Sequence, residues 1–594
     1  MGIPHLITTL ESYASHEVLQ RQAVVIDGPA LAYHVLHLCR LQGASQPSYS
    51  LLSQFVIEWL DRLEDQQITI QAIYFDGYLP TGKYSVRMER VMKTTSRLSL
   101  LYSSYSMGCP RRHVVPSGAL SDDPPRLGQS ADKVSQDPSF VVPAIIDAIR
   151  GHPRYREKCF MVPGEADAYC ASDVAKHGGT ILTGDSDLLA HELGNGKVVF
   201  FRDIHENASS KLACTIYAPR AIYTKLGLSK SVEACRLGYE RLHSPHATLP
   251  MLLKACSRPV SDAVGYDQFR QQYVSHEEAS IPRLIGGGLL ALSALDPRVS
   301  ELLLQLGRAL NTEGVPDKAR IFLPSLLENP NQGTSWDASA QVRRLAYTVA
   351  SRYLDHDRAI SVEEYRRVQN IGQKGRKVPL LSSAEANDAA LALLDLIHRV
   401  RETGISQQHR WILLCVILDI MECNQQGKNS HALITLQQQK GRHPATTGDK
   451  IPWDTIHFSA HIQAAMYSLR ILSQVLSSTM AQNTGTDELA LNLIQILKLL
   501  SELPPLTEFP DVCVVADFLA ASKGLRILPI LSQFIDFEEG PSQEPEQAHR
   551  ETQERKSGRK RTGESHGANK KPSKKPNNTS GNRGNMFSAL SIDI

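Results

Sequence analysis

The chain has 594 residues, of which 42% are hydrophobic and 21% are charged, and its formal net charge is +2. This balance is typical of a soluble globular protein with more than one domain, and it excludes a polycation that binds nucleic acid over its whole surface. The ten cysteines form no C-x-x-C pair, which argues against a structural zinc site and a disulfide framework and suits a reducing compartment.

Residues 1–205 alternate between short apolar strands and helical stretches, which predicts an α/β domain with a mostly parallel sheet flanked by helices. Helical spacing is clearest over Ser50–Glu64 and Glu165–Lys176. A stretch at about 117–138, rich in Ser, Asp, Pro and Gly, predicts a mobile loop. The strands are expected at Ala23–Ile26, Ile70–Phe75, Cys159–Val162, Thr180–Thr183 and Val198–Arg202.

Residues 206–537 carry long apolar-periodic segments and few strand signals, which predicts a large all-helical region. Its most apolar run, Trp411–Met421, is too short to span a bilayer and contains Asp419, so we expect a buried helix and no membrane partner. Polar loops are expected near Glu328–Trp336 and Gln437–Lys450. The helices are expected at Pro250–Cys256, Ala386–Val400, Trp411–Cys423, Ile462–Leu476 and Leu489–Leu500.

Residues 538–594 are poor in apolar side chains and rich in Lys, Arg, Ser, Gly and Asn, which predicts a disordered tail. Basic clusters between Arg555 and Lys575 have the spacing of a bipartite nuclear-import signal, so we expect a nuclear protein, with the cytoplasm as a second location. The same charge would bind nucleic acid non-specifically, and a plain solvated linker is the alternative. The apolar tip Asn585–Ile594 is expected to bind a protein partner or to dock on its own domain.

Six carboxylates lie in four short patches of residues 1–205, at or just after the ends of predicted strands. Acids at the carboxyl ends of parallel strands point into one crevice, where like charges repel unless cations lie between them. This pattern predicts a site for Mg²⁺ or Mn²⁺, with two ions as the usual arrangement for cleaving a phosphodiester. The predicted ligands are Asp27, Asp76, Glu165, Asp167, Asp185 and Asp187.

The alternative for these acids is that they cap helices and occupy turns, as Asp185 would before a helix that begins near Ser186. Capping accounts for one or two of the positions but not for six acids at strand ends. Glu165 and Asp167 are two residues apart and do not share a helix face. Both can reach a metal only from the turn and the first helical turn after Pro163-Gly164, or with one acting through water.

These motifs resemble those of the XPG/flap-endonuclease superfamily, whose nuclease core has a PIN-like fold. The resemblance covers about residues 1–205, begins at Met1-Gly2-Ile3, and matches the six acids in order. It implies that the N-terminal residues lie beside the active site. It also implies a Lys and an Arg at the base of a helical arch over the scissile phosphate, at the positions of Lys83 and Arg90. The alternative is that these residues, with Arg87 and Lys93, form the solvated face of a helix.

The chain departs from flap endonucleases in the Gly-rich helix–hairpin–helix that grips duplex DNA, which we do not find in the sequence. The segments 284–288 and 370–375 are rich in glycine. The second is flanked by Arg366, Arg367, Arg376 and Lys377, which makes it a weak candidate for phosphate contact, with a surface loop as the more common interpretation. Glu240 is a candidate replacement for an acid of the missing element. A PIN-like core followed by a long helical region resembles the asteroid-type branch of the superfamily.

The sequence supports two functional hypotheses. The first is a metal-dependent, structure-specific nuclease that hydrolyses phosphodiester bonds, with Asp27, Asp76, Glu165, Asp167, Asp185, Asp187, Lys83 and Arg90 as its catalytic residues. The resemblance favours branched or flapped DNA as the substrate over RNA. The second is a non-catalytic scaffold with a nuclease fold that acts in RNA regulation or protein interaction, with the helical region and the C-terminal tip as its binding elements. Retention of all six acids favours the enzyme.

Overall fold

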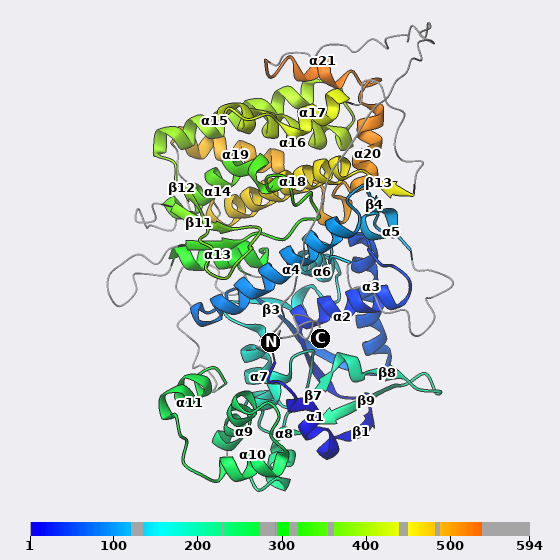
Figure 1. Ribbon diagram of the computed structural model, residues 1–594, viewed down its shortest axis with the longest axis vertical. Helices are drawn as coiled ribbons and strands as arrows, with labels where there is room; N and C mark the ends of the chain where they lie inside the picture. Colours follow the sequence, from blue (N-terminus) through cyan, green and yellow to red (C-terminus); the bar gives the residue numbers. More distant parts are fainter. Residues whose placement is uncertain are drawn as a thin grey trace, which may run out of the picture. The chain divides into compact units, whose positions relative to one another are not determined.

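The computed structural model describes residues 2–119, 135–228, 231–273, 292, 294–307, 319–353, 361–438, 449–480 and 487–536 (Figure 1). Residues Met1–Phe537 form one compact unit. Several predicted features lie outside the described residues. They are the basic tail at 538–594, the glycine-rich segment 284–288, and most of the loops predicted at 117–138 and 437–450. The division of the chain near residue 205 remains a prediction from sequence character.

The predicted α/β fold with a mostly parallel sheet is confirmed. The main sheet has the strand order β1-β9-β7-β6-β2-β3-β5, with β8 paired to β9. The five strands from β7 to β5 run parallel, while β1, β8 and β9 run antiparallel to their neighbours. The strands are β1 (Ser15–Val18), β2 (Ala23–Asp27), β3 (Thr69–Asp76), β5 (Cys159–Val162), β6 (Thr180–Thr183), β7 (Lys197–Phe200), β8 (His205–Glu206) and β9 (Leu212–Tyr217).

Helices cover both faces of the sheet, as the continuous apolar strands require. Alternate residues of β2 point to opposite faces, so Val24 and Ile26 pack in one hydrophobic cluster and Val25 packs in another. The first cluster includes residues of α2, α3 and α6, and the second includes residues of α1 and α7. These helices are α1 (Leu6–Leu10), α2 (Gly28–Leu41), α3 (Tyr49–Asp65), α6 (Val141–Gly151) and α7 (Ala166–His177).

The large helical region is confirmed, and every helical segment predicted in it lies in a helix. Figure 1 shows α14 to α20 packed together at one end of the unit and α8 to α11 grouped at the opposite end. The helices are α8 (Pro219–Lys225), α9 (Ser231–His243), α10 (Leu249–Cys256), α11 (Ala263–Arg270), α13 (Pro297–Gly307), α14 (Ala340–Tyr353), α15 (Ser383–Glu402), α16 (Gln407–Gln425), α17 (His431–Gln438), α18 (Trp453–Met480), α19 (Glu488–Leu500), α20 (Val512–Ala521) and α21 (Ile527–Leu531).

The helical region is not all-helical, which corrects the prediction. Strands β10 (Ala319–Phe322), β11 (Ser361–Tyr365) and β12 (Arg376–Pro379) form a three-stranded sheet. Strand β11 reads S-V-E-E-Y, so its two acids hid the strand pattern. Glu364 is nevertheless 1% exposed, because arginines neutralise it inside the protein. A two-stranded pair, β4 (Cys109–Pro110) with β13 (Lys450–Ile451), links the N-terminal and helical parts.

A buried ion cluster joins the small sheet to the helices α14 and α18. Arg343 on α14 is fully buried and donates to Glu364 from Nε at 2.7 Å and from a terminal nitrogen at 3.1 Å. It also donates to the hydroxyl of Ser468 on α18 at 3.0 Å. Tyr347 and Arg366 donate to the same carboxylate. Burial opposes ionisation, but the two arginines lower the pKa of Glu364 to about 2, so this cluster is ionic.

The N-terminal and helical parts share one hydrophobic core. The ring of Phe140, just before α6, stacks on Tyr467 of α18 with ring centroids 4.4 Å apart. Arg470, one turn along α18, pairs with Asp147 of α6 at 2.8 Å. In the described residues, no helix combines the length and hydropathy needed to cross a membrane.

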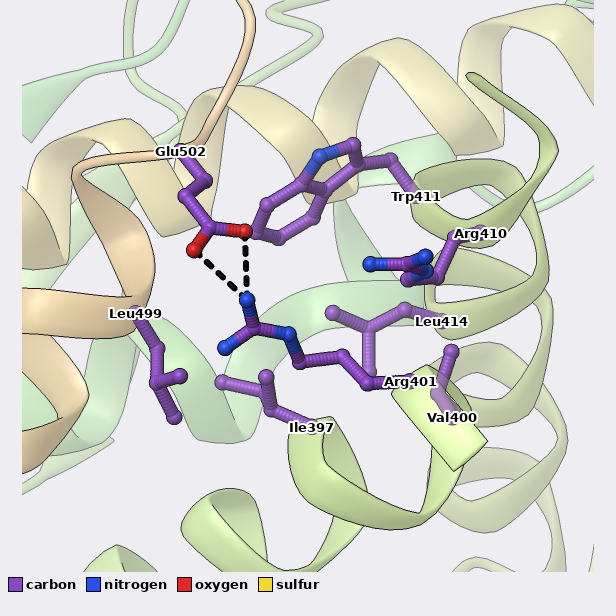
Figure 2. A pocket seen from close by; sticks show the side chains of 8 residues that line it. All are labelled: Ile397, Val400, Arg401, Arg410, Trp411, Leu414, Leu499 and Glu502. Atoms are coloured by element: carbon purple, nitrogen blue, oxygen red, sulfur yellow. Dashed lines mark hydrogen bonds and ion pairs between the residues drawn. The ribbon is translucent and has the colours of Figure 1, made fainter. Parts of the chain in front are cut away.

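A pocket lies between α15, α16 and α19, lined by apolar side chains and by the ion pair of Arg401 with Glu502 (Figure 2). Arg401 donates to both carboxylate oxygens, at 2.6 and 2.8 Å. The cavity measures only about 10 Å³, which is room for about one water molecule. This pocket is therefore a packing feature and not a ligand site.

Candidate metal centre

The six predicted acids lie at one edge of the main sheet. Asp27 and Asp76 are the last residues of β2 and β3, while the other four follow β5 and β6. The strands β6, β2, β3 and β5 are consecutive neighbours and run parallel, so their carboxyl ends meet at the same edge. The glycines after the first two acids allow close packing, because a Cβ on Gly28 would lie 2.6 Å from the Phe75 ring and one on Gly77 would lie 2.3 Å from the carbonyl oxygen of Val162.

Asp27 is held by the neighbouring strand β6 and by the helix α2 that follows it. Its Oδ2 accepts a hydrogen bond from the hydroxyl of Thr183 at 2.7 Å, and its Oδ1 accepts one from the backbone N–H of Ala30 at 3.2 Å. Thr183 also accepts from the backbone N–H of Asp185 at 3.0 Å. This buried threonine, which the sequence analysis missed, therefore fixes two of the acids relative to each other. Its only sequence signal is its place in T-G-D-S-D.

Asp185 and Asp187 lie in a short 3₁₀ helix, Ser186–Ala190, that follows β6. Asp185 caps this helix by accepting from the backbone N–H of Asp187 at 3.1 Å, as the capping alternative predicted. Asp187 accepts a hydrogen bond from the backbone N–H of Ile3 at 2.6 Å. The N-terminal residues therefore lie beside the acids, as the resemblance implied. Capping orients these carboxylates and does not remove them from the cluster.

Glu165 and Asp167 occupy the turn and the first helical turn after Pro163-Gly164, which meets the geometric condition set from sequence. Glu165 is the extended N-cap residue of α7, and its side chain accepts no capping hydrogen bond. The backbone N–H of Ala166 instead donates to Oδ1 of Asp76 at 2.7 Å. The carboxylate of Glu165 is thereby left for a cation.

The pKa values of four of the acids are raised, because the carboxylates are buried and repel one another. Burial raises the pKa of Asp27 to about 7, and Asp76 and Asp185 add to this rise. Burial and the charge of Glu165 raise the pKa of Asp76 to about 6. Burial and Asp185 raise the pKa of Asp187 to about 7, and burial with Asp27 and Asp185 raises the pKa of Asp167. These mutual effects place the acids within electrostatic reach of each other.

Lys83 is the cation that reaches this cluster directly. Lys83 lies just before α4 (Tyr84–Ser104), and its Nζ is 2.7 Å from Oε1 of Glu165. Burial alone would lower the pKa of Lys83, but Glu165, Asp167 and Asp187 raise it overall. Arg90 is exposed on α4, and its positive charge offsets part of the rise in the pKa of Asp76.

Arg87 has a structural role. It pairs with Glu301 of α13 at 2.6 Å, and its guanidinium lies 4.3 Å from the centroid of the Phe322 ring. The alternative of a solvated face is therefore wrong for Arg87, which packs against the helical region, whereas Arg90 and Lys93 are exposed as that alternative predicted. The start of α4 faces the acids.

The donor set fits hard divalent cations, because carboxylate oxygens are the ligands that Mg²⁺ and Mn²⁺ prefer. Buried carboxylates with raised pKa values and one nearby ammonium group leave negative charge that cations would neutralise. The six acids do not form a tight triad of ligand atoms. Within the described residues, three potential ligands lie within 4.8 Å of one another in a histidine cluster far along the chain, formed by His431, His457 and His461.

Two weaker sequence candidates do not join the site. Glu240 on α9 pairs with Arg236 of the same helix at 2.6 Å, so its carboxylate is already neutralised. The segment 370–375 is an exposed connection between β11 and β12. The adjacent Arg366 and Arg367 turn inward to Glu364 and Glu328, whereas Arg376 and Lys377 are exposed, so phosphate contact by this segment stays a prediction that rests on the latter two.

Tyr273 is a site residue that no sequence signal indicated. Burial and the charges of Asp187 and Asp185 raise the pKa of its hydroxyl, which hydrogen-bonds Asp187. It comes from the segment after α11, outside the part of the chain that resembles flap endonucleases. The helical region therefore contributes to the acidic edge.

Parts of this chain are similar to known proteins. A family model described as "XPG domain containing" matches residues 137–378. "Asteroid homolog 1" of Schizosaccharomyces pombe is 25% identical over 393 residues, which cover 62% of this chain and 64% of that protein. A structure of "The catalytic core of Rad2 in complex with DNA substrate" is 17% identical, covers 43% of this chain and 67% of its own, and has a TM-score of 0.25. A second Rad2 core has 14% identity and a TM-score of 0.23, and covers 47% of this chain and 85% of its own.

The chain is therefore similar over part of its length to XPG-type proteins with a nuclease fold, and its acids lie at one edge of a mostly parallel sheet. Within that class the chain resembles the asteroid-type proteins, which confirms the resemblance given by its motifs. The chain spans less than two thirds of the length of the curated relative that it matches.

Proposed function

We propose that this chain is a structure-specific nuclease that depends on divalent cations and hydrolyses phosphodiester bonds in branched or flapped DNA. The observation that carries the proposal is the set of six acids at the adjoining ends of four parallel strands, with the Lys83 ammonium 2.7 Å from Glu165. Asp27, Asp76, Glu165, Asp167, Asp185 and Asp187 would hold two Mg²⁺ or Mn²⁺ ions. The choice of DNA over RNA rests on the resemblance to flap endonucleases.

The protein's own groups prepare the site before any substrate binds. Thr183 and the backbone N–H of Ile3 hold Asp27 and Asp187 in place, which spares reorganisation during reaction. When a substrate binds, the Lys83 ammonium group would leave Glu165, contact a phosphate oxygen and offset the negative charge that develops on it. Bound divalent cations would lower the pKa of the attacking water and neutralise the phosphate.

The test of this function is a panel of end-labelled flapped, nicked and single-stranded DNA, with matched RNA forms, incubated with the full chain and Mg²⁺. We expect cleavage near the branch of flapped DNA, and none in EDTA. Preferential cleavage of RNA would overturn the substrate assignment. Absence of cleavage of all members of the panel would favour the hypothesis of a non-catalytic scaffold.

Lys83→Gln should lower kcat on flapped DNA by about 100-fold, because one preorganised charge at a developing oxyanion contributes about that much. Lys93→Gln is the matched control, since Lys93 is exposed on the same helix. Single-turnover kinetics separate kcat from binding. Equal loss in the two variants would mean that Lys83 acts only through general attraction to DNA.

The acidic edge also predicts a pH-dependent effect of divalent cations on stability. The pKa values of Asp27, Asp76 and Asp187 lie at about 6 to 7 in the folded protein, above the value of about 4 for an unfolded aspartate. The folded state therefore keeps protons that the unfolded state has lost, and the metal-free chain loses stability as the pH rises from about 4 to about 7. Mg²⁺ should raise the melting temperature more at pH 8 than at pH 6.

Asp187→Asn tests this origin, because it removes the charge and keeps an acceptor for the N–H of Ile3. The metal-free variant should be more stable than the wild type at pH 8 by on the order of 2 kcal/mol, and Mg²⁺ should shift its melting temperature less. Asp388→Asn, an exposed position on α15, is the control and should behave as wild type. The account fails if Mg²⁺ stabilises all three proteins equally at both pH values.

A further inference from the structure

Three histidines meet inside the helical region, away from the acidic edge. His431 begins α17, and His457 and His461 lie one turn apart on α18. One ring nitrogen from each can be chosen so that all three lie within 4.8 Å of one another. His457 and His461 are 2% and 8% exposed, so this cluster is largely shielded from solvent.

The spacing of two of these nitrogens matches that of metal ligands. Nε2 of His457 lies 3.1 Å from Nε2 of His461. Two imidazole nitrogens bound tetrahedrally to Zn²⁺, each about 2.0–2.1 Å from the ion, lie about 3.3 Å apart. Nδ1 of His431 is buried and, among the described residues, has no hydrogen-bond partner. Nε2 of the same ring lies 3.5 Å from a carboxylate oxygen of Asp454, so Nδ1 is the nitrogen of His431 that is available to bind a metal.

A second layer of groups supports the cluster. Nδ1 of His461 lies 3.0 Å from Oδ1 of Asp419, which leaves Nε2 of the same ring for a metal. Asp419, the acid in the most apolar run of the sequence, is 1% exposed and also accepts from the hydroxyl of Ser430 at 2.6 Å. Nδ1 of His457 accepts a hydrogen bond from the backbone N–H of Asn329 at 3.3 Å and lies 3.5 Å from the hydroxyl of Ser335, and these contacts fix the orientation of the ring.

The charges around the cluster favour a cation. Metal ligation requires neutral imidazoles, and the buried carboxylate of Asp419 lies beside the cluster, 3.0 Å from Nδ1 of His461. The negative charges of Asp419, on α16, and Glu328, in the connection after β10, attract positive charge at His461. Glu328 is paired with Arg367 at 3.2 Å, whereas the partner of Asp419 is the ring of His461.

We propose that His431, His457 and His461 bind one Zn²⁺ ion that joins α17 to α18, with Asp419 orienting His461. Three imidazoles suit Zn²⁺ and leave a fourth position for water. The site needs no cysteine, which is why the scattered cysteines gave no sign of it. This proposal does not depend on the nuclease function, because it uses none of the six acids.

The test measures Zn²⁺ binding to the metal-stripped, full-length protein by competition with a chromophoric chelator. We expect one tightly bound Zn²⁺ in the wild type, and at least 100-fold weaker binding in His431→Gln and in His457→Gln. Asp419→Asn should weaken binding by about 10- to 100-fold, as is usual for a group that orients a ligand. His398→Gln, an exposed histidine on α15, and Asp187→Asn, at the acidic edge, should both bind Zn²⁺ as the wild type does.

Co²⁺ gives a readout that does not depend on any variant folding correctly. Substituted into the wild type, it should show the intense visible absorption of a tetrahedral site, and added Zn²⁺ should abolish it. The proposal is overturned if the wild type binds Zn²⁺ no more tightly than the folded His431→Gln variant, which would leave only a hydrogen-bonded histidine cluster. It is also overturned if Asp187→Asn removes the binding, which would place the ion at the acidic edge.

Discussion

Asp76→Asn should reduce cleavage of flapped DNA by about 1,000-fold, equivalent to about 4 kcal/mol of transition-state stabilisation. Asp76 ends β3 in the middle of the acidic edge, between the groups that follow β5 and the acid that ends β2. Asparagine keeps the acceptor for the N–H of Ala166 but loses the charge that would hold a cation. Single-turnover cleavage with Mg²⁺ in excess measures the effect.

Two controls separate this result from a loss of fold. The melting temperature of metal-free Asp76→Asn should equal or exceed that of the wild type, because the substitution relieves repulsion among buried acids. Glu240→Gln, whose carboxylate pairs with Arg236, should cleave as the wild type does. Wild-type cleavage by Asp76→Asn would contradict the site assignment.

Glu364→Gln should destabilise the unit Met1–Phe537 by about 3–5 kcal/mol, which is the usual cost of leaving a buried charge without its partner. Arg343 is fully buried and makes two hydrogen bonds to this carboxylate, and an amide cannot neutralise it. Arg366 and Tyr347 bond different oxygens of this carboxylate, and glutamine keeps only one acceptor oxygen, so one of the two donors loses its acceptor. The midpoint of urea unfolding at pH 7 measures the change.

Glu502→Gln is the matched control for this experiment. Glu502 also accepts two hydrogen bonds from one arginine, Arg401, but their side chains are 41% and 34% exposed (Figure 2). An exposed pair contributes only about 0–1 kcal/mol, so this variant should unfold close to the wild type. Similar losses in the two variants would mean that burial does not set the cost of breaking the Arg343–Glu364 pair.

The parallel part of the fold was predictable because its strands are short apolar runs that end in acids. Strands β5 and β6 begin and end at the predicted residues. Strand β2 is one residue longer at its end, β3 is one residue longer at each end, and β7 begins one residue earlier and ends two residues earlier than predicted. Strand β1 reads S-H-E-V, and all but its last residue are exposed. An exposed edge strand needs no apolar alternation, so its sequence gave no signal.

The acids were predictable because ligand type and strand position are both local in sequence. Their supports are not local: Tyr273 reaches Asp187 from more than 80 residues away, and Thr183 gains its role only once β2 and β6 are paired. The histidine cluster joins α17 and α18 across a stretch of chain that separates His431 from His457. Its one local sign was the pair His457 and His461, four residues apart on a helix.

The central claim is that the six acids hold divalent cations, and counting Mn²⁺ ions on the full chain at pH 8 tests it most directly. Free Mn²⁺ is measured by electron paramagnetic resonance in the wild type and in the double variant Asp27→Asn/Asp185→Asn. Both proteins keep the histidine cluster, so their difference reports the acidic edge alone. We predict about two more bound ions in the wild type than in the double variant. Equal binding by the two folded proteins would contradict the claim.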